Sequence, residues 1–151
     1  MNKSWLTAIS RKKLPAPTNY LLSSGLLKGR VLDYGCGRCQ NINTQNGIKY
    51  NYDPYYVPEG RQGKMNVILC NYVLNVVNFE TRLDILQDLF HLLDKNGVIY
   101  LTVRRDITCD YNTKLGTFQY VVKLPFETFH KTKTYETYKI SKYDIHEYLT
   151  S

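Results

Sequence analysis

Unbroken apolar runs alternate with amphipathic segments along this chain. Strands that are buried on both faces of a parallel sheet consist of such runs, which predict strands over 30–34, 67–70 and 98–103. A further β-rich segment, 48–52, follows the first of them. Because strands alternate with helices, we predict an α/β fold with a parallel, doubly wound sheet and right-handed crossovers.

The longest helix is predicted from its cap and its apolar spacing. Asn78 is a suitable N-cap for a helix over 80–94, and Lys95-Asn96-Gly97 is expected to end it. One face carries an apolar stripe that we expect in the core: Phe79, Leu83, Leu86, Phe90 and Leu93. Shorter helices are expected over 19–22, where Thr18 is the N-cap, and over 38–45 and 143–149.

Two segments depart from this alternation. Residues 53–64 are rich in Pro, Gly and Tyr and too irregular for a strand and a helix, so the third strand and helix unit of the sheet is expected to be reduced to a loop. Residues 118–124 and 134–140 are both β-rich and have no helix between them. We expect these two segments to pair as a C-terminal antiparallel hairpin.

Length and composition predict a single domain over 1–151. The chain is 43% hydrophobic and 22% charged, which is ordinary globular composition. No apolar run approaches a membrane span and the N-terminus lacks the apolar block of a signal peptide, so we expect a cytoplasmic protein with no membrane partner. The four cysteines and three histidines form no zinc pattern, so we expect no metal.

The formal net charge of +7 is unevenly distributed. No acidic residue precedes Asp33, whereas six cations do: Lys3, Arg11, Lys12, Lys13, Lys28 and Arg30. Residues 1–17 are expected to form a basic N-terminal arm, because the prolines of Leu14-Pro15-Ala16-Pro17 disfavour a helix there. Such an arm suits a polyanion such as nucleic acid, but it also suits a protein that needs surface charge for solubility.

Polar and glycine residues follow three of the predicted strands. Asp33 is followed by a Gly-x-Gly turn, at which a ligand can approach the backbone N–H groups. Asp53 ends the second strand, the position of a carboxylate that binds the ribose hydroxyls of a nucleoside. Asn71 and Tyr72 follow the third apolar run. The sequence therefore predicts a ligand site at the carboxyl edge of the sheet.

The chain resembles the class I S-adenosylmethionine-dependent methyltransferases in three motifs, Val31-Leu32-Asp33-Tyr34-Gly35-Cys36-Gly37, Tyr52-Asp53-Pro54 and Asn71-Tyr72-Val73-Leu74-Asn75-Val76. Within that family it is most similar to small methyltransferases of phages and to those associated with DNA phosphorothioation. The shorter segments that carry this similarity include Ala8-Ile9-Ser10-Arg11-Lys12, Gly25-Leu26-Leu27 and Val103-Arg104-Arg105-Asp106. The resemblance covers nearly the whole chain and implies a Rossmann-like methyltransferase sheet.

The resemblance also implies roles for individual residues. Asp33 would hold the amino group of S-adenosylmethionine and Asp53 its ribose. Tyr52, Pro54 or Tyr55 would contact the edge of its adenine. The implied cofactor-binding residues are Asp33, Tyr34, Gly35, Cys36, Gly37, Asp53, Pro54, Asn71 and Tyr72. The implied catalytic residues are Asn71 and Tyr72, and the implied substrate contacts are Arg11, Lys12, Arg104 and Arg105. The implied reaction is methyl transfer, most plausibly to a nucleic acid.

Two departures from the family pattern bear on this function. Cys39 occupies the position of the third glycine, and the Asp-Pro-Pro-Tyr signature of amino-directed DNA methyltransferases is absent after the third apolar run. The second hypothesis is therefore a catalytically silent module that keeps the fold and binds nucleic acid or a partner protein.

Two further classes compete for the same residues. A nicotinamide-binding fold would also place an acidic residue at Asp53, although Gly35-Cys36-Gly37 lacks the last glycine of Gly-x-Gly-x-x-Gly. Cys36 and Cys39 have the spacing of a redox Cys-x-x-Cys motif at a helix start. They are equally consistent with two small residues in a turn.

Overall fold

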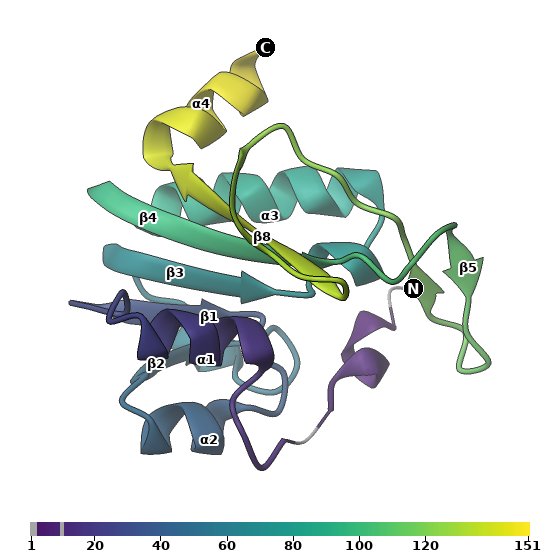
Figure 1. Ribbon diagram of the computed structural model, residues 1–151, viewed down its shortest axis with the longest axis horizontal. Helices are drawn as coiled ribbons and strands as arrows, with labels where there is room; N and C mark the ends of the chain where they lie inside the picture. Colours follow the sequence, from purple (N-terminus) through teal and green to yellow (C-terminus); the bar gives the residue numbers. More distant parts are fainter. Residues whose placement is uncertain (1–2, 10) are drawn as a thin grey trace.

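The central sheet has six strands in the order β2-β1-β3-β4-β8-β7 (Figure 1). The computed structural model describes residues 3–9 and 11–151. Parallel pairing joins β1 (Val31–Tyr34), β2 (Tyr50–Tyr52), β3 (Met65–Asn71) and β4 (Leu93–Arg104). Antiparallel pairing adds β8 (Tyr135–Ser141) and β7 (Glu127–Lys131). The predicted α/β architecture, mostly parallel with an antiparallel hairpin, is confirmed, and it is compatible with a Rossmann-like fold.

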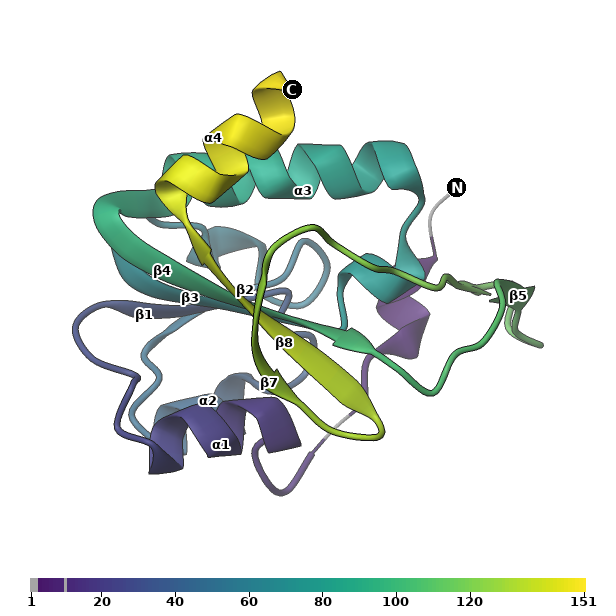
Figure 2. The ribbon, with the colours of Figure 1, turned by 45° about the horizontal axis from the view of Figure 1, so that its top comes forward.

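Helices cover both faces of this sheet (Figure 2). One face packs against α1 (Ala16–Ser23), and α2 (Gln40–Gln45) lies on the same side of the sheet. The other face packs against α3 (Phe79–Leu92) and α4 (Lys142–Thr150). Alternate residues of β3 pack into the two apolar layers, one on each face of the sheet, because successive side chains of a strand point to opposite faces. No helix in residues 3–9 and 11–151 is long and apolar enough to cross a membrane.

The long helix α3 begins as its sequence predicts but ends differently. Asn78 is the N-cap, and its side chain accepts a hydrogen bond of 2.9 Å from the backbone N–H of Thr81. Phe79, expected in the core, is 58% exposed. The segment 95–97 does not end the helix: the chain passes directly into β4, where Leu93 already pairs with Met65 of β3. Sheet pairing has replaced the predicted stop.

The C-terminal hairpin exists, but the predicted partner of its last strand is wrong. β8 pairs with β7, whereas Phe118–Gln119 (β6) pairs with Tyr111–Asn112 (β5) in a separate two-stranded sheet. The reason is local: the Thr132 hydroxyl accepts hydrogen bonds from the backbone N–H groups of Thr134 and Tyr135, which closes a tight turn between β7 and β8. The last helix, α4, is confirmed and starts with a capping box at Ser141.

The N-terminal arm is more ordered than its prolines suggest. Ser4–Thr7 form a short 3₁₀ helix, η1, and α1 begins at Ala16 with Pro17 in its first turn. The expectation that this proline segment is non-helical is therefore wrong at Ala16 and Pro17. A proline at the start of a helix costs little, because the N–H group that it lacks would have no helical partner there.

The segment 53–64 is irregular, as its composition predicts. Among the described residues no strand of this sheet lies beyond β2, and the segment holds one 3₁₀ turn, η2 (Pro58–Gly60). The loop backbone passes directly over β2: a Cβ built on Gly60 would lie 1.6 Å from the carbonyl oxygen of Asn51. An ion pair between Arg61 and Asp88 ties the end of the loop to α3.

Candidate functional site

A cavity of about 800 Å³ opens at the carboxyl ends of β1, β2 and β3. The strand order reverses there, since the chain passes from β1 to β2 on one side while β3 lies on the other side, and ligands of open α/β sheets bind at such switch points. The residues implied to bind a cofactor all line this cavity: Asp33, Tyr34, Gly35, Cys36, Gly37, Asp53, Pro54, Asn71 and Tyr72. The structure thus brings together residues from three separate strand ends.

The Gly-x-Gly turn is held against the second strand by backbone bonds. The N–H groups of Gly35 and Cys36 both donate to the carbonyl oxygen of Tyr52, over 2.7 and 2.9 Å. Gly35 has a φ of +80°, and a Cβ at this position would lie 2.4 Å from the Val73 side chain. Only glycine fits both requirements, so the backbone of the turn lies directly beside the segment that follows β3.

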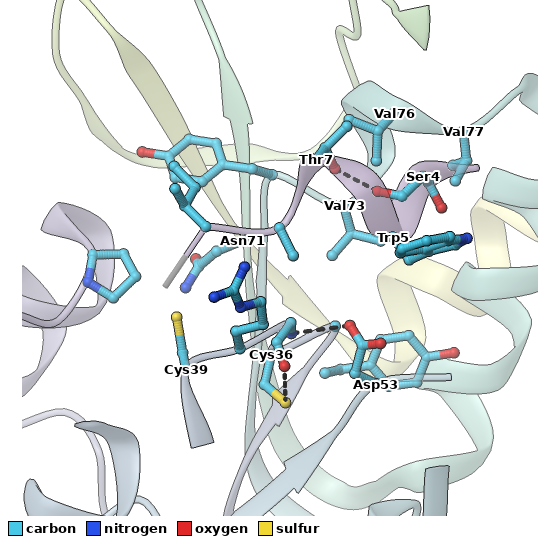
Figure 3. Close-up of a pocket in the computed structure, with 18 of the residues that line it drawn as sticks. Ser4, Trp5, Thr7, Cys36, Cys39, Asp53, Asn71, Val73, Val76 and Val77 are labelled. Atoms are coloured by element: carbon cyan, nitrogen blue, oxygen red, sulfur yellow. Dashed lines mark hydrogen bonds between the residues drawn. The ribbon is translucent and has the colours of Figure 1, made fainter. Parts of the chain in front are cut away.

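The Asp53 carboxylate connects the turn with the loop that follows β2. Its Oδ2 accepts a hydrogen bond of 2.9 Å from the backbone N–H of Gly37, which is drawn in Figure 3. Its Oδ1 accepts from the N–H groups of Tyr55 and Tyr56, over 2.9 and 3.0 Å. An ionised carboxylate has about four lone-pair positions, so Asp53 retains acceptor capacity for a ligand.

Asp33 is a buried carboxylate at the floor of the site, only 4% exposed. Burial raises its pKa to about 6, the hydrogen bond from Asn43 lowers it, and the nearby charge of Asp53 raises it. The two ion pairs of the described residues, Arg61–Asp88 and Arg104–Asp106, do not involve Asp33. The site therefore presents a carboxylate that an incoming cation would stabilise.

Asn71 and Tyr72 lie where β3 ends. Asn71 Nδ2 donates to the Thr18 hydroxyl of α1 over 2.8 Å, and Asn71 Oδ1 is buried without a hydrogen-bond partner among the described residues. Tyr72 has a φ of +62°, which is uncommon for a residue other than glycine, and its N–H donates to the carbonyl of Thr102. Strained backbone of this kind concentrates at functional sites.

The four basic residues implied to contact substrate separate into two pairs. Arg11 and Arg104 line the cavity, whereas Lys12 and Arg105 do not. Arg104 forms an ion pair of 2.8 Å with Asp106, which also lines the cavity. The Arg105 side chain instead donates to the carbonyl of Thr132 in the turn between β7 and β8. The geometry therefore favours Arg11 and Arg104 as contacts of a bound molecule.

The two cysteines of the Cys-x-x-Cys spacing are neutral thiols in this environment. Both are buried, and burial raises the pKa of Cys36 and of Cys39 above the usual thiol value. Reactive redox cysteines require the opposite shift, since the thiolate is the nucleophile. The arrangement thus argues against the redox interpretation. Cys39 is the N-cap residue of α2 and lines the cavity.

Several residues that line the cavity were not among the predicted site residues. The N-terminal segment contributes Trp5, Thr7, Ala8 and Ile9, and the segment after β3 contributes Val73, Val76 and Val77. In Figure 3 Trp5 lies above Asp53, with the three valines on the same side of the cavity. The valines follow a strand end, which is the one pattern that indicates their location. Within the described residues, no cluster of three or more His, Cys, Asp or Glu side chains suits a metal ion.

Comparison with known proteins gives little further information. No protein-family model matches the chain, and no curated protein matches it. Among solved structures, the chain is similar to PKMT2 from Rickettsia typhi with a TM-score of 0.35 and 20% sequence identity. The similarity covers 50% of this chain and 21% of the PKMT2 chain. A likeness at this level carries no functional argument.

Proposed function

We propose that this protein binds S-adenosylmethionine and transfers its methyl group, with a nucleic acid as the acceptor. One observation carries the proposal: Asp33, Asp53 and the turn of Gly35 to Gly37, from two adjacent parallel strands, meet at one cavity. Its volume of about 800 Å³ lies within the range of small-molecule sites.

The residues at the cavity fit the chemistry of this cofactor. Asp33 is a buried carboxylate outside any ion pair of the described residues, so it would bind the ammonium group of the methionine part. Asp53 accepts three hydrogen bonds and so retains about one further acceptor position for a ribose hydroxyl. The cofactor supplies an electrophilic methyl group, and the protein supplies binding and orientation.

The residues after β3 would act on the acceptor. Asn71 is fixed by Thr18 so that its buried Oδ1 is available to a hydrogen-bond donor. Tyr72 presents its side chain to the same cavity. Alignment of the acceptor atom with the methyl carbon is the main contribution expected of such residues, because a near-attack geometry replaces an encounter in solution.

Charge supports a nucleic acid as the acceptor. The chain has a formal net charge of +7, and Arg11 places a guanidinium group at the cavity beside that of Arg104, which is paired with Asp106. Phosphate neutralisation releases counterions, so binding should weaken as the salt concentration rises. Arg11→Gln should reduce the slope of log affinity against log salt by about 1, whereas Arg105→Gln, outside the cavity, should change it less.

Calorimetric titration with S-adenosylmethionine and with S-adenosylhomocysteine tests the cofactor. We expect micromolar binding, weakened at least about tenfold by Asp33→Asn. Asp84→Asn, on the exposed surface of α3, is the matched control and should leave the affinity unchanged. Asp53→Ala should abolish binding but also frees three backbone N–H groups, so its folding must be checked by thermal denaturation.

A silent binding module is the second candidate, and Cys39 is the observation that favours it. This residue lines the cavity at a position where the family resemblance implies glycine. The silent module predicts no cofactor binding at millimolar ligand together with salt-sensitive binding of DNA or RNA. Cys39→Gly should then be the first variant titrated with the cofactor.

A further inference from the structure

Trp5 and Tyr55 form an aromatic stack at one wall of the cavity. Their ring centroids are 4.2 Å apart and their planes differ by 5°. Both residues line the cavity, and Tyr55 follows Asp53 by two positions. Tyr55 is 55% exposed, so this stack lies at the mouth of the site rather than in the core. Figure 3 places the Trp5 ring above the Asp53 carboxylate.

The segment that carries Trp5 is lightly anchored. None of the residues of η1 is buried. The contacts that join this segment to the domain include a hydrogen bond of 3.3 Å from the Tyr56 hydroxyl to the Trp5 carbonyl, and the approach of Ala8 to Gly37. Segments with few buried apolar contacts open at low free-energy cost. We therefore expect the wall made by residues 3–9 to separate from the rest of the cavity at low free-energy cost.

The position of the stack relative to Asp53 indicates what it would bind. If Asp53 binds the ribose hydroxyls of a nucleoside, the attached base lies within reach of the loop that begins at Pro54. Tyr55 is on this loop, and Trp5 covers it. Two neutral aromatic rings recognise a planar ring by stacking on its faces, with little dependence on the pattern of its hydrogen-bonding groups.

We propose that Trp5 and Tyr55 are a ring-binding pair that separates to admit the adenine of the cofactor between them, with residues 3–9 closing over the bound nucleoside. This assignment rests on the proposed function, because it takes Asp53 as the ribose ligand. It makes Trp5 a binding residue and gives the N-terminal segment a role in the cofactor site as well as near the acceptor.

Trp5 is the single tryptophan of the chain, so its fluorescence reports on this pair directly. Excitation at the red edge of tryptophan absorption avoids absorption by adenine. Adenosine and S-adenosylhomocysteine should both change the emission of the wild-type protein, whereas methionine alone should not. A response to methionine equal to that of adenosine would overturn the assignment of Trp5 to the base.

Affinity variants give the second readout. Trp5→Ala should weaken binding of S-adenosylhomocysteine by about 5- to 150-fold, the range expected for loss of one stacked ring, and Trp5→Phe should weaken it less. Tyr143→Ala removes an aromatic side chain that is 68% exposed on α4 and should leave affinity unchanged. Thermal denaturation of each variant establishes that it is folded.

The outcomes separate the two proposals. Calorimetric binding of S-adenosylhomocysteine with unchanged Trp5 emission and unchanged affinity in both Trp5 variants overturns the ring-binding pair and leaves the proposed function standing. Absence of calorimetric binding in the wild-type protein overturns the proposed function, and the ring-binding pair falls with it. Binding that is weakened by Trp5→Ala and largely retained by Trp5→Phe supports both.

Discussion

Asn43 Nδ2 lies 2.7 Å from Asp33 Oδ2, so a side chain of α2 holds the carboxylate at the floor of the cavity. The same amide nitrogen lies 2.7 Å from Asn51 Oδ1 on β2. Asn43 is fully buried, so water does not compete for these bonds. The ionisation of Asp33 in the free protein therefore depends on a residue ten positions along the chain, through a bond that favours the charged form.

Replacement of Asn43 by Ala should destabilise the protein. It removes the donor of two buried acceptors, so the free energy of unfolding should fall by about 1–3 kcal/mol. The pKa of Asp33 should rise further, because the bond that lowers it is lost. Urea denaturation measures the first effect. Thr44→Ala, at an exposed position of the same helix, should change stability by less than about 0.5 kcal/mol. Equal losses in the two variants would contradict the assigned role.

Replacement of Asp33 by Asn should stabilise the free protein at neutral pH. The folded-state pKa of Asp33 is raised to about 6 from 3.8, so the folded state binds this proton more tightly than the unfolded state does. The contribution of Asp33 to stability therefore falls as the pH rises from about 4 to about 6 and stays low above that range. Asp33→Asn removes this dependence.

The gain in the free energy of unfolding should be on the order of 3 kcal/mol at about pH 8, since each pKa unit corresponds to about 1.4 kcal/mol. Urea denaturation across this pH range measures the difference. A gain that does not grow between about pH 4 and about pH 6 would show that Asp33 is not the group responsible. Together with the expected loss of cofactor affinity, this variant would separate stability from binding.

Gly35→Ala should lower the free energy of unfolding by more than the strain of its backbone conformation alone would. The φ of +80° costs about 1–2 kcal/mol for an L-residue, and the new Cβ would also meet Val73 at 2.4 Å. Gly116→Ala is the matched control, because its φ is +77° and no atom lies within 4 Å of the built Cβ. Denaturation should be measured for Gly35→Ala in the presence and absence of Val73→Ala. If the Val73 contact causes the extra loss of unfolding free energy, Val73→Ala should reduce that extra loss in the double variant. No recovery would exclude the Val73 contact as its cause.

Tyr34→Phe should weaken the anchor of the loop between β2 and β3. The Tyr34 hydroxyl donates to Asp88 Oδ2 over 2.7 Å, and Arg61 Nε donates to the same oxygen over 2.9 Å. Burial opposes the ionisation of Asp88, but these two hydrogen bonds lower its pKa overall. The free energy of unfolding should fall by about 0.5–1.5 kcal/mol at neutral pH.

The loss should diminish in acid. Because the folded-state pKa of Asp88 is lowered, the stability that it contributes is present above the unfolded value of 3.8 and is lost as the pH falls through the lowered pKa. Denaturation at about pH 3 and about pH 7 checks this sign. Tyr143→Phe, at an exposed position, should have no effect at either pH. A Tyr34→Phe loss that is constant with pH would rule out coupling to Asp88.

The sheet and the floor of the site were predictable because both follow from burial and connectivity. Strands covered on both faces must be apolar throughout, which marks β3 and most of β4 in the sequence. Parallel strands deliver their carboxyl ends to one edge, so Asp33, Asp53 and Asn71 meet at one cavity although 38 positions separate the first from the last.

The other features of the fold and the site depend on contacts between residues far apart in the sequence, which no local pattern encodes. Phe118–Gln119 has the composition of a strand, but composition does not show which strand it pairs with. The short turn at Thr132 brings β7 next to β8, so Phe118–Gln119 pairs with β5 instead. Trp5 enters the site only because the arm folds back onto Tyr55, a contact between residues 50 positions apart. Asn43 was likewise missed, since a polar residue in a short helix gives no sign that it is buried.

β2 is one of the two edge strands of the central sheet, and β7 is the other. An open strand edge is a template on which another chain can add, and it promotes aggregation. The loop over 53–64 lies against β2, and the absence of a side chain at Gly60 lets its backbone pass within contact of Asn51. The loop over 53–64 thus covers part of the edge of β2, and we expect a bulky side chain at position 60 to displace the loop and leave that edge open to pairing with another chain.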